Sequence, residues 1–252
     1  MGRVNNKVAL VTGGASGVGK ETVELLLKEG AYVAFGDIDV QSGEALAKAC
    51  GERALFLRHD VSNEAEWQEV IAKVQAHFGP LDILINNAGI LLPGSIETAT
   101  LAQFRQLMQV NADSCFLGCQ QGIAAMKERG GSIVNMASVS TWLPIEGYAG
   151  YSASKAAVAA LTRASALYCR KNGLAIRVNS LHPDGIYTPM MKATAPGVPE
   201  KYLLFDPKVN PKGRAIMPEH IAKVLLFLAS DDSVAISGAE IKADSAILGM
   251  GL

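Results

Sequence analysis

The chain has 252 residues, 49% of them hydrophobic, and a formal net charge of -1 at pH 7. This length and apolar content suit one large α/β domain, and the balanced charge gives no reason to expect nucleic acid or an acidic membrane as a partner. No apolar run reaches the roughly 18 residues of a membrane span, and residues 1–6 lead into an apolar segment without a secretory signal, so we expect a cytoplasmic protein.

Seven short apolar segments alternate with helical patterns along the chain. They lie at residues 7–12, 31–36, 54–57, 81–86, 132–137, 174–180 and 239–242. Strands that alternate with helices form a parallel sheet covered on both faces. Since no repeat, low-complexity segment or linker interrupts the pattern, the sequence predicts a single domain over residues 1–252. The expected fold is doubly wound (Rossmann) α/β, with seven parallel strands.

The first apolar segment is followed by a glycine-rich turn at residues 13–19 and a helical pattern at residues 20–29. Glycines permit a tight turn and close approach of a ligand, while the first amides and the dipole of a helix attract a phosphate. A glycine loop alone is often a plain turn, and its spacing differs from the commoner Gly-x-Gly-x-x-Gly pattern. Its place at the first strand-to-helix junction favours a dinucleotide site.

Asp37 ends the next strand candidate, about twenty residues beyond the glycine turn. A carboxylate there can bind both hydroxyls of an adenosine ribose and would repel a 2′-phosphate. No Arg or Lys lies between Asp37 and Lys48 to offset that charge, so the sequence favours NAD over NADP. The alternative is that Asp37 only starts a turn or caps the following helix.

Tyr151 and Lys155 lie four residues apart at the start of an alanine-rich, helix-favouring segment. On a helix the phenol and the ammonium would share one face. A phenol has a pKa near ~10 in water, and a nearby positive charge lowers it, so Lys155 could prepare Tyr151 for proton transfer. Ser138 follows the apolar segment 133–137, where its hydroxyl could hold a substrate oxygen beside the phenol. Such a Tyr-x-x-x-Lys pair also occurs by chance on solvated helices.

Together these motifs resemble those of the single-domain short-chain dehydrogenase/reductases, nearly from end to end of the chain. That family transfers hydride between a secondary alcohol and NAD(P). The resemblance implies catalytic roles for Ser138, Tyr151, Lys155 and Asn111. The cofactor contacts that it implies are Gly13, Ser16, Gly17, Val18, Gly19, Asp37, Asp60, Val61, Asn87, Ala88, Gly89, Tyr151, Lys155, Pro183, Ile186 and Thr188.

The family pattern gives these segments different tasks. Residues 12–19 would bind the pyrophosphate, Asp60 and Val61 the adenine, and residues 86–89 would steady the sheet beside the cofactor. Asn111 would interrupt a helix, and its backbone carbonyl would hold a water that links Lys155 to solvent. From the sequence alone, Asn111 is more typical of an ordinary polar helix position.

One segment departs from the family pattern, which usually has Pro-Gly where this chain has Pro183, Asp184 and Gly185. The resemblance implies that Ile186 and Thr188 still hold the nicotinamide carboxamide. Asp184 could stabilise a turn, or it could present a polar group to the substrate.

Residues 118–127, 138–146, 182–191 and 247–252 are similar to segments of bacterial 3β/17β-hydroxysteroid dehydrogenases. This similarity implies a steroid alcohol or ketone as substrate, NAD as cofactor and a homotetramer. Apolar side chains after the strand ends suit a large, flat alcohol, although several could instead serve subunit packing or a lid hinge. They are Leu91, Leu92, Val139, Trp142, Leu143, Ile145, Tyr148, Tyr187, Met190 and Met191.

Residues 189–213 contain four prolines after Pro189 and follow the nicotinamide segment, which predicts a substrate lid. An unremarkable long loop is the alternative. The helical pattern at 219–229 and the apolar tail at 246–252 resemble association surfaces. The four cysteines, at 50, 115, 119 and 169, match no metal-ligand spacing, so we expect reduced thiols and no metal. Cys115 and Cys119 fit one face of a buried helix.

The sequence thus favours an NAD-dependent dehydrogenase that acts on a 3β- or 17β-hydroxysteroid. A dehydrogenase or ketone reductase for smaller cyclic or aryl alcohols would use the same chemistry. A non-catalytic NAD-sensing protein would not need Ser138, Tyr151, Lys155 and Asn111 together. A hydrolase is disfavoured because Ser138 lacks the Gly-x-Ser-x-Gly elbow.

Overall fold

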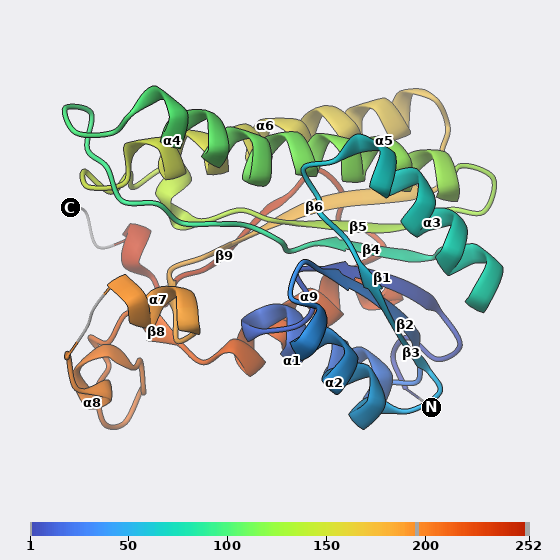
Figure 1. Cartoon of the computed structure of the whole chain (residues 1–252), viewed down its shortest axis with the longest axis horizontal. Helices are drawn as coiled ribbons and strands as arrows, with labels where there is room; N and C mark the ends of the chain where they lie inside the picture. The colour runs from blue at the N-terminus through green and yellow to red at the C-terminus, as the bar shows by residue number, and fades with distance from the viewer. Residues whose placement is uncertain (1, 195–196, 250–252) are drawn as a thin grey trace.

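A computed structural model describes residues 2–194 and 197–249 and shows one sheet between two layers of helices (Figure 1). Within those residues the main sheet has seven parallel strands, as the sequence predicts. Across the sheet they are ordered β3 (Ala54–Arg58), β2 (Tyr32–Asp37), β1 (Val8–Thr12), β4 (Ile83–Asn86), β5 (Gly131–Met136), β6 (Ile176–Pro183) and β9 (Glu240–Ala243). Every strand overlaps its predicted segment, and β6 continues beyond it to Pro183.

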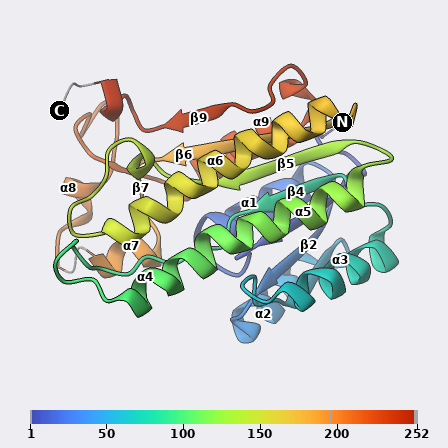
Figure 2. The same cartoon turned by 90° about the horizontal axis from the view of Figure 1, so that it is seen from above.

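Two layers of helices cover the sheet. One face carries α3 (Glu64–Phe78), α4 (Leu101–Leu107), η1 (Met108–Asp113), α5 (Ser114–Met126) and α6 (Ala149–Lys171), and α5 and α6 run side by side along it (Figure 2). The other face carries α1 (Gly17–Lys28), α2 (Val40–Cys50) and α9 (Pro218–Ala229). This is the doubly wound arrangement expected from strand-helix alternation.

The strands bury both faces, which explains why they are continuous apolar runs instead of alternating ones. On β1, Val8 and Leu10 pack into the core below α3, α5 and α6, whereas Ala9 and Val11 pack into the core against α1 and α9. All four side chains are buried. The period of two that separates the two cores follows from the pleat of a strand.

Polar side chains inside the sheet are paired with one another. The Asn86 side-chain amide donates to Asn135 Oδ1 at 2.8 Å, and the Asn135 amide donates to Thr162 Oγ1 at 2.9 Å. These bonds join β4, β5 and α6 just beneath the end of the sheet where the strands stop. Cys115 and Cys119 are both buried, one turn apart on α5, and both carry free thiols.

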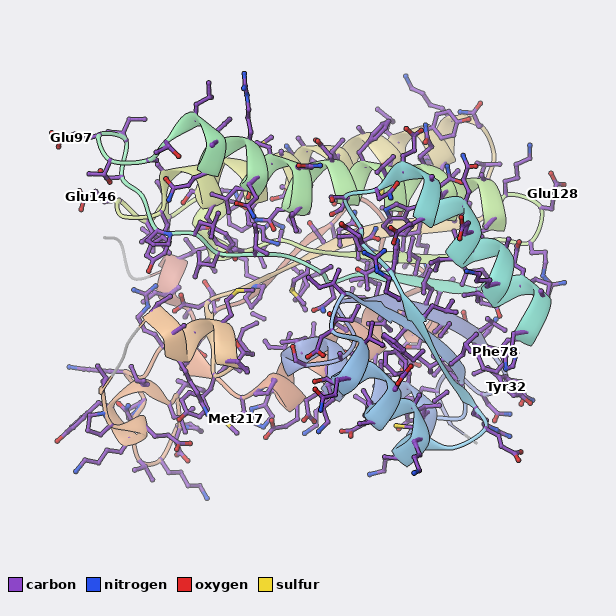
Figure 3. All side chains as sticks on the ribbon, viewed as in Figure 1. Tyr32, Phe78, Glu97, Glu128, Glu146 and Met217 are labelled. Atoms are coloured by element: carbon purple, nitrogen blue, oxygen red, sulfur yellow. The ribbon has the colours of Figure 1, made fainter. Side chains whose placement is uncertain are left out.

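The strand order indicates at which end of the sheet a ligand would bind. The order reverses between β1 and β4, and in such sheets ligands bind beyond the carboxyl ends of the strands at that point. Toward the opposite end, the rings of Tyr32 and Phe78 pack at 5.4 Å between their centres (Figure 3). Glu97 and Glu146 mark the loops at the carboxyl end in the same view.

Short elements complete that end. They are η2 (Val139–Thr141), β7 (Gly185–Ile186), α7 (Pro189–Thr194), α8 (Glu200–Leu203), β8 (Ala215–Ile216) and η4 (Ile247–Gly249). η3 (Asp231–Ser233) lies at the other end, beside the start of β6, where Ser233 accepts from Arg177. The predicted lid, residues 189–213, contains α7 and α8, and residues 195–196 within it lie outside the described part. The predicted apolar tail, residues 246–252, includes η4, and its residues 250–252 also lie outside the described part of the chain. Within the described residues, no helix combines the length and the apolar character needed to cross a bilayer.

Candidate active site

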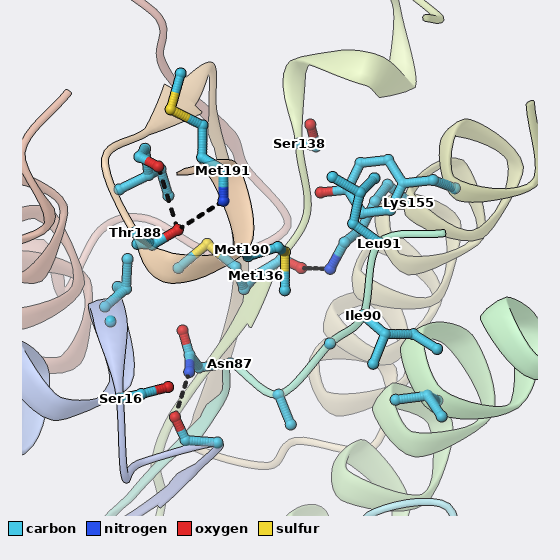
Figure 4. Close-up of a pocket in the computed structure, with 18 of the residues that line it drawn as sticks. Ser16, Asn87, Ile90, Leu91, Met136, Ser138, Lys155, Thr188, Met190 and Met191 are labelled. Atoms are coloured by element: carbon cyan, nitrogen blue, oxygen red, sulfur yellow. Dashed lines mark hydrogen bonds between the residues drawn. The ribbon is translucent and has the colours of Figure 1, made fainter. Parts of the chain in front are cut away.

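A cavity of about 730 Å³ lies beyond the carboxyl ends of the strands. Most of the residues predicted from the sequence line it: Gly13, Ser16, Gly17, Val18, Asp37, Asp60, Val61, Asn87, Ala88, Gly89, Ser138, Tyr151, Lys155, Pro183, Ile186 and Thr188. In the close-up, Ser138 and Lys155 face the cavity from one side, and Thr188, Met190 and Met191 from the other (Figure 4). Gly19 and Asn111 do not line the cavity, but each supports residues that do.

The glycine turn adopts backbone angles that would be strained for any other residue. Gly13 has φ of 63° and Gly17 has φ of 52°, both in the left-handed region. A Cβ at Gly13 would lie 2.8 Å from the Cα of Ala88, and one at Gly19 would overlap the carbonyl oxygen of Gly13. The turn therefore packs tightly against the end of β4 and brings the N-terminus of α1 to the cavity, where a pyrophosphate fits.

Asp37 links the end of β2 to the glycine turn. Its Oδ2 accepts a hydrogen bond from Ala15 N at 3.0 Å, and its Oδ1 accepts one from Asp39 N at 3.1 Å. The capping alternative is wrong, because Asp39 caps α2 by accepting from Ser42 N. The turn alternative is confirmed, because the bond from Asp39 N closes a turn on the Asp37 side chain. Asp37 also lines the cavity, where its carboxylate fits the position of a ribose partner.

Asn87 holds the turn from the other side. Its side-chain amide donates to the carbonyls of Thr12 and Gly13, at 3.0 and 3.1 Å. The hydroxyl of Thr12 in turn accepts from the backbone amides of Asn87 and Ala88. The end of β1 and the segment after β4 are thus joined by four hydrogen bonds at the floor of the cavity.

Asp60 and Val61 lie at the far wall of the cavity, after β3. The Ser62 hydroxyl and amide both donate to Asp60 Oδ1, which lowers the pKa of that carboxyl. The carbonyl of Val61 accepts from Trp67 Nε1 at 2.9 Å. These bonds fix the backbone at the position predicted for adenine.

Tyr151 and Lys155 occupy one face of α6, as predicted, with Lys155 Nζ 5.8 Å from the centre of the Tyr151 ring. Lys155 Nζ donates to the carbonyl of Met136 at 2.8 Å. Ser138 follows β5, and its hydroxyl accepts from Ser140 N at 3.2 Å. The three side chains meet in the cavity beyond β5.

Burial shifts the pKa values of both Tyr151 and Lys155. It raises the pKa of Tyr151, and the neighbouring Ser138 hydroxyl opposes this rise. It also lowers the pKa of Lys155 to about 8, while the Cys115 thiol favours the charged form. The sequence predicted that Lys155 would lower the pKa of Tyr151, but burial dominates and raises it. The ammonium donates to the Met136 carbonyl while it lies over the Tyr151 ring.

Asn111 is buried in η1, a π-helical turn between α4 and α5. Its Oδ1 accepts from Ile90 N at 2.8 Å, and its Nδ2 donates to Ile90 O and Ser154 Oγ, both at 3.0 Å. The Ser154 hydroxyl donates to the Tyr151 carbonyl at 2.7 Å. Asn111 thus interrupts a helix, as the resemblance implied, and ties the segment after β4 to α6, the helix that carries Tyr151.

Comparison with known proteins agrees with this geometry. A family model described as enoyl-(acyl carrier protein) reductase matches residues 13–246. A 3-beta-hydroxysteroid dehydrogenase of Comamonas testosteroni is 66% identical over 251 residues, which are 99% of this chain and 99% of that protein. The chain belongs to the short-chain dehydrogenase/reductase family. It is therefore an oxidoreductase that acts on secondary alcohols and uses an NAD(P) cofactor.

Two other relatives of this short-chain dehydrogenase are more distant. A 3-alpha-(or 20-beta)-hydroxysteroid dehydrogenase of Mycobacterium tuberculosis is 39% identical over 244 residues, 96% of this chain and 90% of that protein. An NADP-dependent (R)-specific alcohol dehydrogenase of Lentilactobacillus kefiri is 35% identical over 246 residues, 96% of each chain. All three relatives are named for alcohol or hydroxysteroid oxidation, a different reaction from the one in the family model's description.

Asp184, the departure from the family pattern, forms an ion pair with Arg214. The Arg214 guanidinium donates through Nε to Oδ2 and through one terminal nitrogen to Oδ1, both at 2.8 Å. The Asp184 side chain is only 7% exposed, whereas that of Arg214 is 53% exposed. The pair stands beside the small sheet of β7 and β8, so Asp184 stabilises this dehydrogenase's backbone at the base of the predicted lid. Asp184 also lines the cavity, so neither of the two roles considered for it is excluded.

The apolar lining was predicted only in part. Leu91, Val139, Ile145, Tyr148, Met190 and Met191 line the cavity, whereas Leu92, Trp142, Leu143 and Tyr187 do not. The lining residues that the sequence reasoning missed include Ile38, His59, Ser62, Ile90, Gln106, Gln109, Val110, Met136 and Thr194. Ile90 and Met136 adjoin predicted residues, so extending each motif by one or two positions would have found them. Gln106 and Gln109 carry no signal, because only the packing of α4 and η1 brings them to the cavity.

Proposed function

We propose that this enzyme transfers a hydride between NAD and the carbinol carbon of a 3β- or 17β-hydroxysteroid. The observation that carries the proposal is the 66% identity, over nearly the whole chain, to the Comamonas testosteroni 3-beta-hydroxysteroid dehydrogenase. The cavity is compatible with such a substrate, because apolar side chains from several segments line it. They include Leu91, Val139, Ile145, Met190 and Met191.

NAD is proposed as the cofactor because of the charge beside the ribose position. The carboxylate of Asp37 lines the cavity and is fixed by the amides of Ala15 and Asp39. A 2′-phosphate would meet this carboxylate, and like charges at contact cost several kcal/mol. The residues that would hold the cofactor are the predicted ones, from Gly13 to Thr188. When bound, the nicotinamide accepts or gives the hydride at C4.

Three side chains carry out the proton transfer in this proposal. Tyr151 as phenolate takes the proton of the substrate hydroxyl, and Ser138 donates a hydrogen bond to the same oxygen. Lys155 binds the ribose hydroxyls and, once turned from the Met136 carbonyl, places its charge near the phenol. Asn111 supports this group from η1, and its backbone carbonyl holds a water on the path from Lys155 to solvent.

The surroundings of the site are part of the same proposal. Residues 189–213 act as a lid over the steroid, and the chain assembles as a homotetramer in the cytoplasm. The lid exposes the apolar side chains of Tyr202 and Val209, at 65% and 81%. Apolar side chains on a mobile cover suit a steroid that enters from water.

The test is the initial rate of NAD+ reduction with a 3β-hydroxysteroid and with a 17β-hydroxysteroid, next to NADP+ as acceptor. We expect fast turnover of at least one steroid with NAD+ and little with NADP+. Cyclohexanol and an aryl alcohol serve as the smaller substrates of the alternative proposal. Faster turnover of these than of either steroid would refute the steroid assignment and leave the alcohol chemistry in place.

A further inference from the structure

His182 lies beside the predicted active site, although nothing in the proposed mechanism uses it. It belongs to β6 and its side chain is fully buried. Its Nδ1 lies 3.0 Å from the carbonyl oxygen of Ser138, and its Nε2 lies 2.8 Å from Ser180 Oγ. The Trp142 ring stacks on the imidazole at 4.4 Å, with an angle of 34° between the planes.

These contacts determine which nitrogen carries the proton. A carbonyl oxygen only accepts hydrogen bonds, so Nδ1 must be the donor to Ser138. Nε2 of a neutral imidazole is then an acceptor, and the Ser180 hydroxyl donates to it. Burial lowers the pKa of His182 to about 4, and Lys155, Arg163 and Lys242 act in the same direction. The ring is therefore neutral at ordinary assay pH.

The position of His182 explains why this bond matters. The backbone ladder between β5 and β6 ends with the bond from Ala137 N to Leu181 O, so Ser138 is the first residue beyond the sheet. At that point the His182 side chain makes the next link across the two strands. The Ser138 carbonyl also accepts from Thr141 N at 3.1 Å, which closes the turn of η2.

His182 thus holds both ends of the turn from Ser138 to Trp142, one by a hydrogen bond and the other by stacking. We propose that His182 is a positioning residue for Ser138, and that its Nδ1 proton fixes the turn so that the serine hydroxyl faces the substrate oxygen. This inference rests on the proposed function, because it assigns Ser138 a place in the reaction.

Three variants test the contact. In His182→Leu the donor to Ser138 is lost with little change in volume, and we expect kcat for the steroid to fall roughly 10- to 100-fold. In His182→Asn the amide can occupy the place of Nδ1–H, and most of the lost kcat should return. Ser180→Ala is the matched control, since it removes a buried partner of the same ring without touching Ser138, and its kcat should fall far less.

Binding and stability separate positioning from a general loss of structure. The Kd for NADH should stay at the wild-type value in all three variants, because His182 is not among the residues that line the cavity. Wild-type kcat in His182→Leu would overturn the proposal. So would equal losses of kcat in Ser180→Ala and His182→Leu, or a folded His182→Asn enzyme with no recovery.

A measurement without substrate keeps the test independent of the proposed function. The chain has four histidines, so nitrogen-15 labelling of histidine gives a simple spectrum in which His182→Asn identifies one residue. A protonated Nδ1 and an unprotonated Nε2 support the proposal, and the reverse tautomer refutes it. Failure of the proposed function would be seen separately, as wild-type enzyme that turns over no steroid.

Discussion

The two sides of the cavity are held in different ways. On the glycine-turn side, Asp37 and Asn87 bind the turn directly, and the bonds of Asn87 run to backbone carbonyls at 3.0 and 3.1 Å. On the lid side, residues 189–213 form a long connection between β7 and β8. Their two ends are joined by the pairing of β7 with β8 and by the ion pair of Asp184 with Arg214.

This difference between the two sides fits the two molecules that they would bind, the cofactor and the steroid. The cofactor side binds a group of constant shape, and many short bonds to the backbone give it a fixed geometry. The lid side encloses an apolar substrate through side chains on a long connection, which can adapt its shape. We therefore expect changes on the first side to alter cofactor choice and rate, and changes on the second to alter substrate affinity by smaller factors.

Tyr151, on α6, is the proton acceptor of the proposed reaction, and its loss should have the largest effect. Tyr151→Phe removes the proton acceptor and leaves the ring volume unchanged. We expect kcat to fall roughly 10²- to 10⁴-fold, the usual contribution of a general acid or base. The Kd for NADH, measured by fluorescence, should change little. Tyr148→Phe is the control, because it removes a second phenol from the same cavity; an equal loss there would refute the special role of Tyr151.

Lys155→Met should reduce the rate by a smaller factor and weaken cofactor binding as well. We expect roughly a 10²-fold loss in kcat/KM, because the charge that favours the phenolate is gone. The KM for NAD+ should rise too, and an unchanged value would contradict the ribose contact.

Unfolding adds a pH signature to the Lys155 test. In the folded protein burial lowers the pKa of Lys155 to about 8, below its ordinary 10.5. The unfolded chain therefore binds more protons between these two values, and the stability of the wild type should rise with pH across that window. The Lys155→Met variant lacks this contribution. Urea unfolding of both proteins at neutral pH and near pH 9.5 measures the difference, and parallel pH profiles would show that the ammonium is not buried as described.

Asp37 sharpens the comparison on the cofactor side. Asp37→Ala removes the charge that would oppose a 2′-phosphate, so the preference for NAD+ over NADP+ in kcat/KM should fall by about 10-fold or more. Asp39→Ala is the matched control, because that carboxylate caps α2 and does not line the cavity. Preservation of the preference in Asp37→Ala would show that another group selects the cofactor.

The parts of this molecule that the sequence predicted are those with local signals. Strands, the glycine turn, and the pair of Tyr151 and Lys155 follow from spacing within one or two elements. Contacts between distant loops carry no such signal. Trp142 was expected in the substrate lining, yet its ring stacks on His182, which lies 40 positions later. The rise in the pKa of Tyr151 was likewise missed, because it depends on burial by several elements at once.

Removal of the ion pair between Asp184 and Arg214 tests what is expected of the lid side. Arg214→Met leaves Asp184 without its bidentate partner, and the segment from Gly185 to Ile216 should loosen. Since the Arg214 side chain is about half exposed, solvent weakens the pair, and we expect only a roughly two- to fivefold rise in the KM for the steroid.

Turnover of cyclohexanol should change less than turnover of the steroid, because a small alcohol needs little from the lid. Lys212→Met removes a nearby exposed cation and is the matched control. Equal changes for both alcohols in Arg214→Met would place the effect on Ile186 and Thr188, and so on the cofactor. A steroid-specific change would show that Asp184, which stands where the family pattern has glycine, acts through the lid that it anchors.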